Sequence, residues 1–152
     1  MNKYQWRSAT GASRCSPHEV TKKTARKGSC CERRVARLLW DRKKLAVSTD
    51  LRNICSLIIG VRRSRHRSYE DVVLKTDLIV QMKGLVENMV EVEVQIKYSE
   101  QAVISFQALN QEQHKVVVSA SPFVPGDVLL ERLLTLIFQV WKKKVGLITH
   151  VA

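Results

Sequence analysis

The run MVEVEVQIKY, residues 89–98, carries the strongest fold signal in this chain, because apolar and polar side chains alternate along it from Val90 onward. A period of two residues is typical of a β-strand with one buried face. Two further runs with similar alternation follow, Ala102–Leu109 and Lys115–Ala120, and the polar segments between them suit turns. We therefore predict an antiparallel β-meander over about residues 88–121.

The period changes after the break at Pro125-Gly126. From Val128 to Trp141, apolar residues recur at helical spacing, and Asp127 is a residue type favoured at the start of a helix. Gly146 stands where a glycine commonly ends one. We predict a long C-terminal helix over about residues 127–145 that packs on the sheet, preceded by short basic helices. The predicted fold class is therefore α+β.

A rival interpretation treats residues 69–109 as an α-helical coiled coil. Apolar residues at alternating spacings of four and three support it. They are Leu78, Met82, Leu85, Met89, Val92, Ile96, Val103 and Phe106. Against it, each β-branched residue in the run of valines costs a helix about half a kcal/mol relative to alanine. A coiled coil would also leave Val90 and Val94 facing water, so we favour the sheet.

Positive charge is concentrated in the first half of the chain. Residues 1–67 contain 18 Lys and Arg against 4 acids, whereas residues 68–152 contain 8 against 10. The formal net charge is +12. Such an excess favours a polyanionic partner, for which we consider nucleic acid, an anionic lipid surface or an import receptor. RNA is the partner that we place first.

We divide the chain into three regions. Residues 1–31 are expected to be a basic disordered tail or a targeting segment that resembles an organellar transit peptide. Residues 32–67 form a basic helical region, and residues 68–152 form a small α+β domain. No secretory signal and no apolar run long enough to span a bilayer is present. We therefore expect an intracellular protein, either organellar or nuclear and cytoplasmic.

The basic helical region supplies the candidate nucleic-acid ligands. Its cations lie on an amphipathic run, Glu32–Leu45, and in an arginine cluster, Val61–Ser68. They could equally remain solvated on the surface. The candidates are Arg33, Arg34, Arg37, Arg42, Lys43, Lys44, Arg62, Arg63, Arg65 and Arg67.

A second functional hypothesis starts from the loop SPFVPG, residues 121–126, which leads into the long helix. An antiparallel sheet that grips a C-terminal helix after such a loop resembles the end of START-type helix-grip domains. The resemblance implies a carrier of an apolar ligand or lipid, held between sheet and helix. Its candidate contacts are Ile104, Phe106, Leu134, Phe138 and Trp141. A third hypothesis is a subunit that docks on a partner protein.

The sequence contains none of the common catalytic or metal-binding motifs. Neither the cysteines nor the histidines show zinc-ligand spacing, so we predict no metal site and no cofactor. Glu91 and Glu93 share one face of the predicted strand, where we expect them simply to be hydrated. We therefore predict a binding protein without enzymatic activity.

Overall fold

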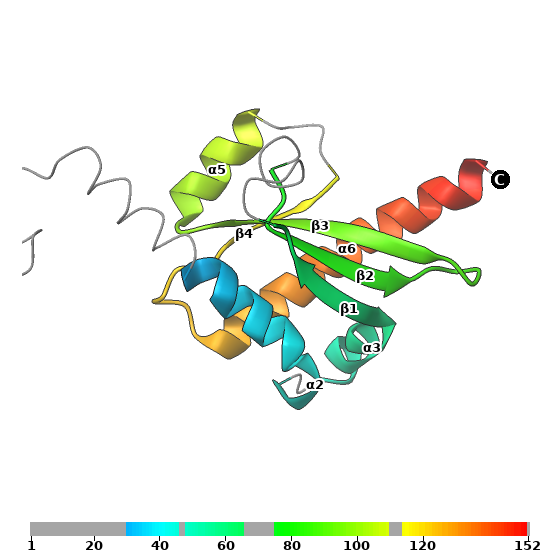
Figure 1. Ribbon diagram of the computed structural model, residues 1–152, viewed down its shortest axis with the longest axis horizontal. Helices are drawn as coiled ribbons and strands as arrows, with labels where there is room; N and C mark the ends of the chain where they lie inside the picture. Colours follow the sequence, from blue (N-terminus) through cyan, green and yellow to red (C-terminus); the bar gives the residue numbers. More distant parts are fainter. Residues whose placement is uncertain (1–29, 46–47, 66–74, 110–113, 152) are drawn as a thin grey trace, which may run out of the picture.

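The computed structural model describes residues 30–45, 48–65, 75–109 and 114–151, shown in Figure 1. Apart from residues 30 and 31, the predicted basic tail lies outside these ranges. A helix over residues 30–40 comes first. The elements that follow are α2 (Arg42–Leu45), α3 (Thr49–Leu57), β1 (Ile58–Arg63), β2 (Leu78–Lys83), β3 (Met89–Lys97), α5 (Glu100–Leu109), β4 (Val116–Ser119) and α6 (Gly126–Val151).

The four strands form one sheet in the order β1-β2-β3-β4. β1, β2 and β3 make an antiparallel meander, whereas β4 pairs with β3 in parallel. Parallel neighbours cannot be joined by a tight turn and need a crossover connection, which α5 provides. The fold class is α+β with a long C-terminal helix, as predicted. No coiled coil forms, because β2, β3 and α5 interrupt the described part of residues 69–109.

Two elements differ from the sequence prediction. The run Ala102–Leu109 is helical rather than extended, and its buried residues Val103 and Phe106 are spaced by three as on a helix face. The Ser99 hydroxyl accepts a hydrogen bond from the Ala102 amide at 3.2 Å, which caps the start of α5. The second difference concerns α6, which continues beyond Gly146 to Val151. One glycine inside a long helix costs only about 1 kcal/mol.

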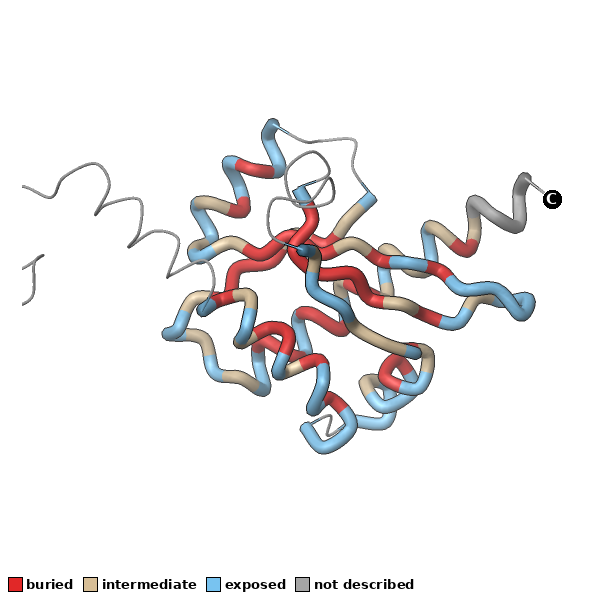
Figure 2. Tube along the Cα trace, viewed as in Figure 1, coloured by how far each residue is buried: buried red, intermediate tan, exposed pale blue. Residues whose placement is uncertain are grey.

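One hydrophobic cluster joins the first helix, the sheet and α6. Alternate residues of the strands point into it, and Figure 2 shows the buried residues gathered on the strands and on the helix turns beside them. The largest fully buried side chains are Leu39, Leu78, Met82, Leu129, Leu130, Leu133, Leu134, Ile137, Val35, Val80, Val92 and Val94. Among the described residues, no helix combines the length and apolar character needed to cross a bilayer.

The other face of the sheet is more polar, although buried Ile79 of β2 also lies on it. By strand alternation it carries Glu91, Glu93, Gln95 and Lys97 of β3. Helix α5 covers part of this face, since the Lys97 ammonium lies 4.5 Å from the centre of the Phe106 ring. The part of the polar face that α5 leaves uncovered is therefore where solutes can approach the sheet.

Core packing predicts the effect of a truncation in α6. Leu134 is fully buried, so Leu134→Ala should lower the free energy of unfolding by about 2–5 kcal/mol. Leu109→Ala, at an exposed position of α5, serves as the matched control and should change it by less than about 0.5 kcal/mol. Denaturant titration followed by circular dichroism measures both, and equal stabilities would contradict this packing of α6.

Candidate functional site

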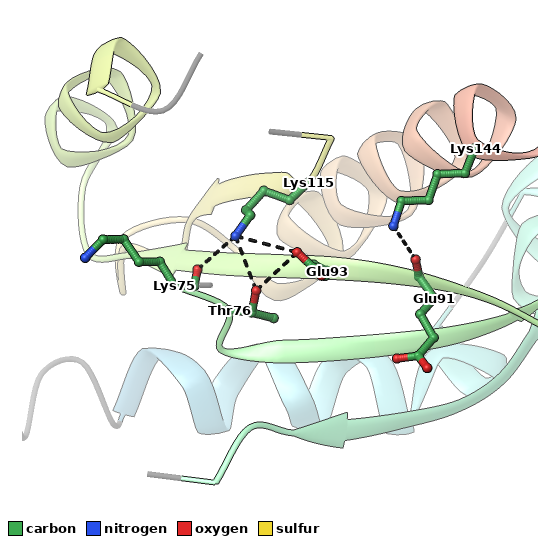
Figure 3. A network of polar contacts seen from close by, with 6 residues as sticks. All are labelled: Lys75, Thr76, Glu91, Glu93, Lys115 and Lys144. Atoms are coloured by element: carbon green, nitrogen blue, oxygen red, sulfur yellow. Dashed lines mark hydrogen bonds and ion pairs between the residues drawn. The ribbon is translucent and has the colours of Figure 1, made fainter. Parts of the chain in front are cut away.

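The strand register gathers polar residues from three separate segments on the polar face. Leu78 pairs with Val94 in antiparallel orientation, which places Asp77, just before β2, opposite Gln95. Val94 also pairs with Val116 in parallel orientation, which places Lys115, just before β4, beside Glu93. Figure 3 shows the contacts of Lys115 with Lys75, Thr76 and Glu93.

Lys115 is the centre of this cluster. Only 3% of its side chain is exposed, and its Nζ lies 3.6 Å from Glu93 Oε2. The same nitrogen donates to Thr76 Oγ1 at 3.3 Å and to the Lys75 carbonyl at 3.4 Å. These three acceptors match the three donors of an ammonium group. Thr76 Oγ1 in turn donates to Glu93 Oε2 at 3.3 Å, which fixes the position of that carboxylate.

The groups around Lys115 shift its pKa in opposite directions. Desolvation by burial lowers the pKa of the ammonium below its usual 10.5 and outweighs the other effects. The charge of Glu93, its hydrogen bond and the charge of Asp77 raise the pKa, while Lys144 lowers it. Lysine is almost never fully buried without a partner. A buried lysine whose pKa is perturbed between two carboxylates is a feature that clusters at functional sites.

Asp77 and Gln95 complete the cluster. Asp77 is buried, and its Oδ2 accepts a hydrogen bond from the Ile96 amide at 2.7 Å, so the backbone of β3 orients the carboxylate. Gln95 is only 8% exposed, and its Oε1 has no hydrogen-bond partner within the described ranges. A buried amide oxygen without a partner costs free energy. A cation at this position would satisfy it.

The donor set suits a hard divalent cation. Asp77, Glu93 and Gln95 offer carboxylate and amide oxygens, the ligands that Mg²⁺ prefers. In the part of the chain that the structure describes, no group of three or more His, Cys, Asp or Glu could hold a metal. Mg²⁺ is nevertheless usually held by one or two carboxylates, with waters and substrate phosphates completing its shell.

One edge of β3 gives access to the cluster. β4 pairs only with Val94–Lys97, so no described strand pairs with the preceding residues of β3 on that side. Lys144 of α6 reaches this edge and donates to the Glu91 carbonyl at 2.6 Å, as Figure 3 shows. The Glu93 side chain is 31% exposed, so it is accessible while Lys115 is not.

Several of the candidate nucleic-acid ligands bond to other segments of the protein. Arg34 donates to the carbonyls of Ser121 and Val124, and buried Arg42 donates to those of Leu39 and Ile58. These two arginines join the first helix to the rest of the fold. Two more form ion pairs on the surface, Arg62 with Glu91 at 3.8 Å and Arg63 with Glu32 at 2.9 Å.

The remaining cations are exposed or lie outside the described residues. Arg33 is exposed and donates to Cys30 Sγ at 3.8 Å. Arg37, Lys43, Lys44 and Arg65 are exposed as well, and Arg67 is outside the described ranges. The exposed cations can therefore contact a phosphate, whereas Arg34 and Arg42 bond to other parts of the fold.

The five apolar-ligand candidates do not meet at one place. Leu134 is fully buried in the core and Phe106 is buried beneath Lys97, whereas Ile104 on the same helix is exposed. Phe138 and Trp141 stack with ring centres 5.6 Å apart, and Trp141 Nε1 donates to the Lys83 carbonyl at 2.8 Å. Trp141 therefore attaches α6 to the end of β2, and Phe138 packs against its ring.

Sequence reasoning missed Thr76, Asp77, Gln95 and Lys115, and the expectation that Glu93 would simply be hydrated was wrong. The physical reason is the parallel pairing of β4, which brings Lys115 beside Glu93. One signal was available, since Asp77 directly precedes a buried apolar run and thus lies at a strand end.

Comparisons with known proteins found no family model, no curated protein and no solved structure that matches this chain.

Proposed function

We propose that this chain binds nucleic acid through phosphate contacts. The support is the excess of cations in residues 1–67, of which several on the first helices and after β1 are exposed. Arginine and lysine contacts to phosphate give affinity that falls as salt rises, with little dependence on sequence. RNA remains the first ligand to test, with DNA beside it. The apolar-carrier and protein-docking interpretations remain predictions from the sequence.

The binding test compares two sets of substitutions. Changing Arg37, Lys43, Lys44 and Arg65 together to Ala should weaken RNA binding and lower the slope of log affinity against log salt by about 0.7 for each phosphate that is no longer neutralised. Arg52→Ala with Arg132→Ala is the control, because these exposed cations lie outside the proposed set. Fluorescence anisotropy at several salt concentrations measures both variants. Unchanged affinity and slope in the fourfold variant would contradict the proposed phosphate contacts.

The polar cluster favours a second function, the metal-dependent hydrolysis of a phosphodiester. The observation that carries it is the contact of the buried Lys115 ammonium with Glu93, together with the unpartnered amide oxygen of Gln95, which lies two residues further along the same face of β3. Carboxylates with Mg²⁺ and a neighbouring ammonium are groups that stabilise charge on a transferring phosphoryl group.

Each residue then has a defined task. Asp77, Glu93 and Gln95 would hold Mg²⁺, which polarises the phosphate and acidifies a bound water. Lys115, which substrate cannot reach, holds the Glu93 carboxylate in place through its ammonium group, and Lys97 lies further along the same face. The water oxygen forms a bond to phosphorus as one phosphorus–ester oxygen bond breaks. The water loses one proton to solvent and the departing oxygen gains one, leaving a phosphate monoester and a hydroxyl group.

A direct assay tests the hydrolytic function. Purified protein is incubated with single-stranded RNA, single-stranded DNA and duplex DNA, with Mg²⁺ or with EDTA, and the products are resolved by electrophoresis. We expect cleavage of at least one substrate that requires Mg²⁺. Salt-dependent binding without cleavage of any of the three would remove the hydrolytic function and leave the binding function standing.

A further inference from the structure

The turn between β2 and β3 exposes apolar side chains at its tip. Leu85 is 63% exposed, Val86 is 79% exposed and Met89 is 51% exposed. Glycine, asparagine, aspartate and serine dominate ordinary turns, because they suit the turn backbone and bond to it. Single exposed apolar residues need no explanation, but three at one tip form a protruding apolar edge.

This tip is held firmly. The Gly84 amide donates to the Asn88 carbonyl at 2.8 Å, which closes the turn. A Cβ on Gly84 would lie only 1.8 Å from Asn88 Oδ1, so a larger residue here would force the Asn88 side chain to move. The hydrogen bond from Trp141 Nε1 to the Lys83 carbonyl attaches the end of β2 to α6. Figure 1 accordingly shows the turn and the last part of α6 at the same end of the molecule.

Cations accompany the apolar tip. Lys83 is exposed at the end of β2, and Lys142 and Lys143 are exposed directly after Trp141, which bonds to Lys83. Glu87 is the acid at the tip itself. An apolar point flanked by ammonium groups complements a surface in which apolar base faces lie between rows of phosphates.

We propose that the tip formed by Leu85, Val86 and Met89 inserts between base pairs of double-stranded DNA. This inference rests on the proposed function, because the same strand leads from the tip to the polar cluster, for which we propose hydrolysis. Met89 and Glu93 are four residues apart, which is about 13 Å along a strand. The tip and the cluster are therefore close enough to contact the same duplex.

DNA fits the tip better than duplex RNA does. Inserted Leu, Ile, Phe or Met side chains unstack and kink DNA from the minor groove, most easily at flexible pyrimidine–purine steps. The minor groove of duplex RNA displays 2′-hydroxyls instead. The three apolar tip residues cannot hydrogen-bond to those hydroxyls.

The experiment uses duplexes with 2-aminopurine at successive positions, because this base fluoresces more strongly when it is unstacked. Full-length protein with the substitution Asp77→Asn keeps the duplex intact in Mg²⁺. We expect increased fluorescence at one step of duplex DNA. Changing Leu85, Val86 and Met89 together to Ser should abolish the increase and weaken duplex binding about tenfold, with single-strand affinity unchanged. Leu109→Ser with Phe123→Ser, at exposed apolar sites elsewhere, should behave like the parent.

The outcomes separate this inference from the function on which it rests. Duplex binding without any fluorescence increase, or with the same increase in the tip variant, overturns the insertion and leaves nucleic-acid binding intact. A tip-dependent response with duplex RNA but not DNA overturns it too, as does tip-dependent binding to phosphatidylserine vesicles in place of DNA. Failure of the parent protein to bind any nucleic acid removes the proposed function and the insertion together.

Discussion

Lys115→Met is expected to lower the rate of phosphodiester cleavage by about 10–100-fold, with nucleic-acid affinity changed much less. The side chains are similar in length, so methionine can fill the same buried space without the charge. A loss of this size is typical when a group that orients a metal ligand is removed, and Lys115 contacts the proposed ligand Glu93. Single-turnover cleavage at saturating protein measures the chemical step separately from binding.

Lys143→Met is the matched control, because Lys143 is exposed on α6 and contributes nothing to the cluster. It should cleave at the parental rate. A Lys115→Met protein that is folded and cleaves as fast as the parent would contradict the role assigned to the ammonium.

The lowered pKa of Lys115 also predicts a pH dependence. Because the ammonium is the active form, cleavage should decline as pH rises through its pKa, which lies below 10.5. This alkaline decline should be absent from the residual activity of Lys115→Met.

The free energy of unfolding should change with pH in the opposite direction to the cleavage rate. The folded state releases the Lys115 proton more readily than the unfolded state, so between the folded pKa and 10.5 the unfolded state binds more protons. The free energy of unfolding of the parent should therefore rise with pH in this window relative to Lys115→Met. Denaturant titrations at neutral and alkaline pH give the comparison. Glu93 is 31% exposed and can be hydrated once its partner is replaced, so Lys115→Met should still fold.

The sequence predicted elements more reliably than it predicted their pairing. The alternation of Val90, Val92 and Val94 was sufficient to place β3, and the helical period after Pro125 was sufficient to place α6. In contrast, the apolar residues of Ala102–Leu109 fit both the period of a strand and the period of a helix, because the segment is short. Ser99 and the burial of Val103 and Phe106 decide in favour of a helix, and that burial exists only when the sheet is present.

The candidate site could not be read from the sequence for a related reason. Asp77, Glu93 and Lys115 are separated by long stretches of chain and belong to no short motif. Only the antiparallel register of β2 with β3 and the parallel register of β3 with β4 bring them together. Once α5 is assigned as a strand, that strand pairs with β3 in the meander and separates β3 from β4, so Lys115 moves away from Glu93. The cluster therefore disappears from any all-antiparallel prediction.

Asp77→Asn tests the metal, which is the other strong expectation. Asparagine keeps the shape and can still accept the hydrogen bond from the Ile96 amide, so the fold should persist while the charge that attracts Mg²⁺ is lost. Because disturbing even residues behind metal ligands costs 10–100-fold, losing a ligand charge should lower cleavage at least about 100-fold. It should also raise the Mg²⁺ concentration needed for half of the remaining rate.

Nucleic-acid affinity should be unchanged or slightly higher in Asp77→Asn, since a negative charge beside the phosphate has been removed. Glu91→Gln is the matched control, because Glu91 lies on the same face of β3 but pairs with Arg62 rather than with Lys115. It should keep the parental rate and Mg²⁺ dependence. If Asp77→Asn instead cleaves at the parental rate with the parental Mg²⁺ requirement, Asp77 is no metal ligand and the buried cluster serves the fold alone.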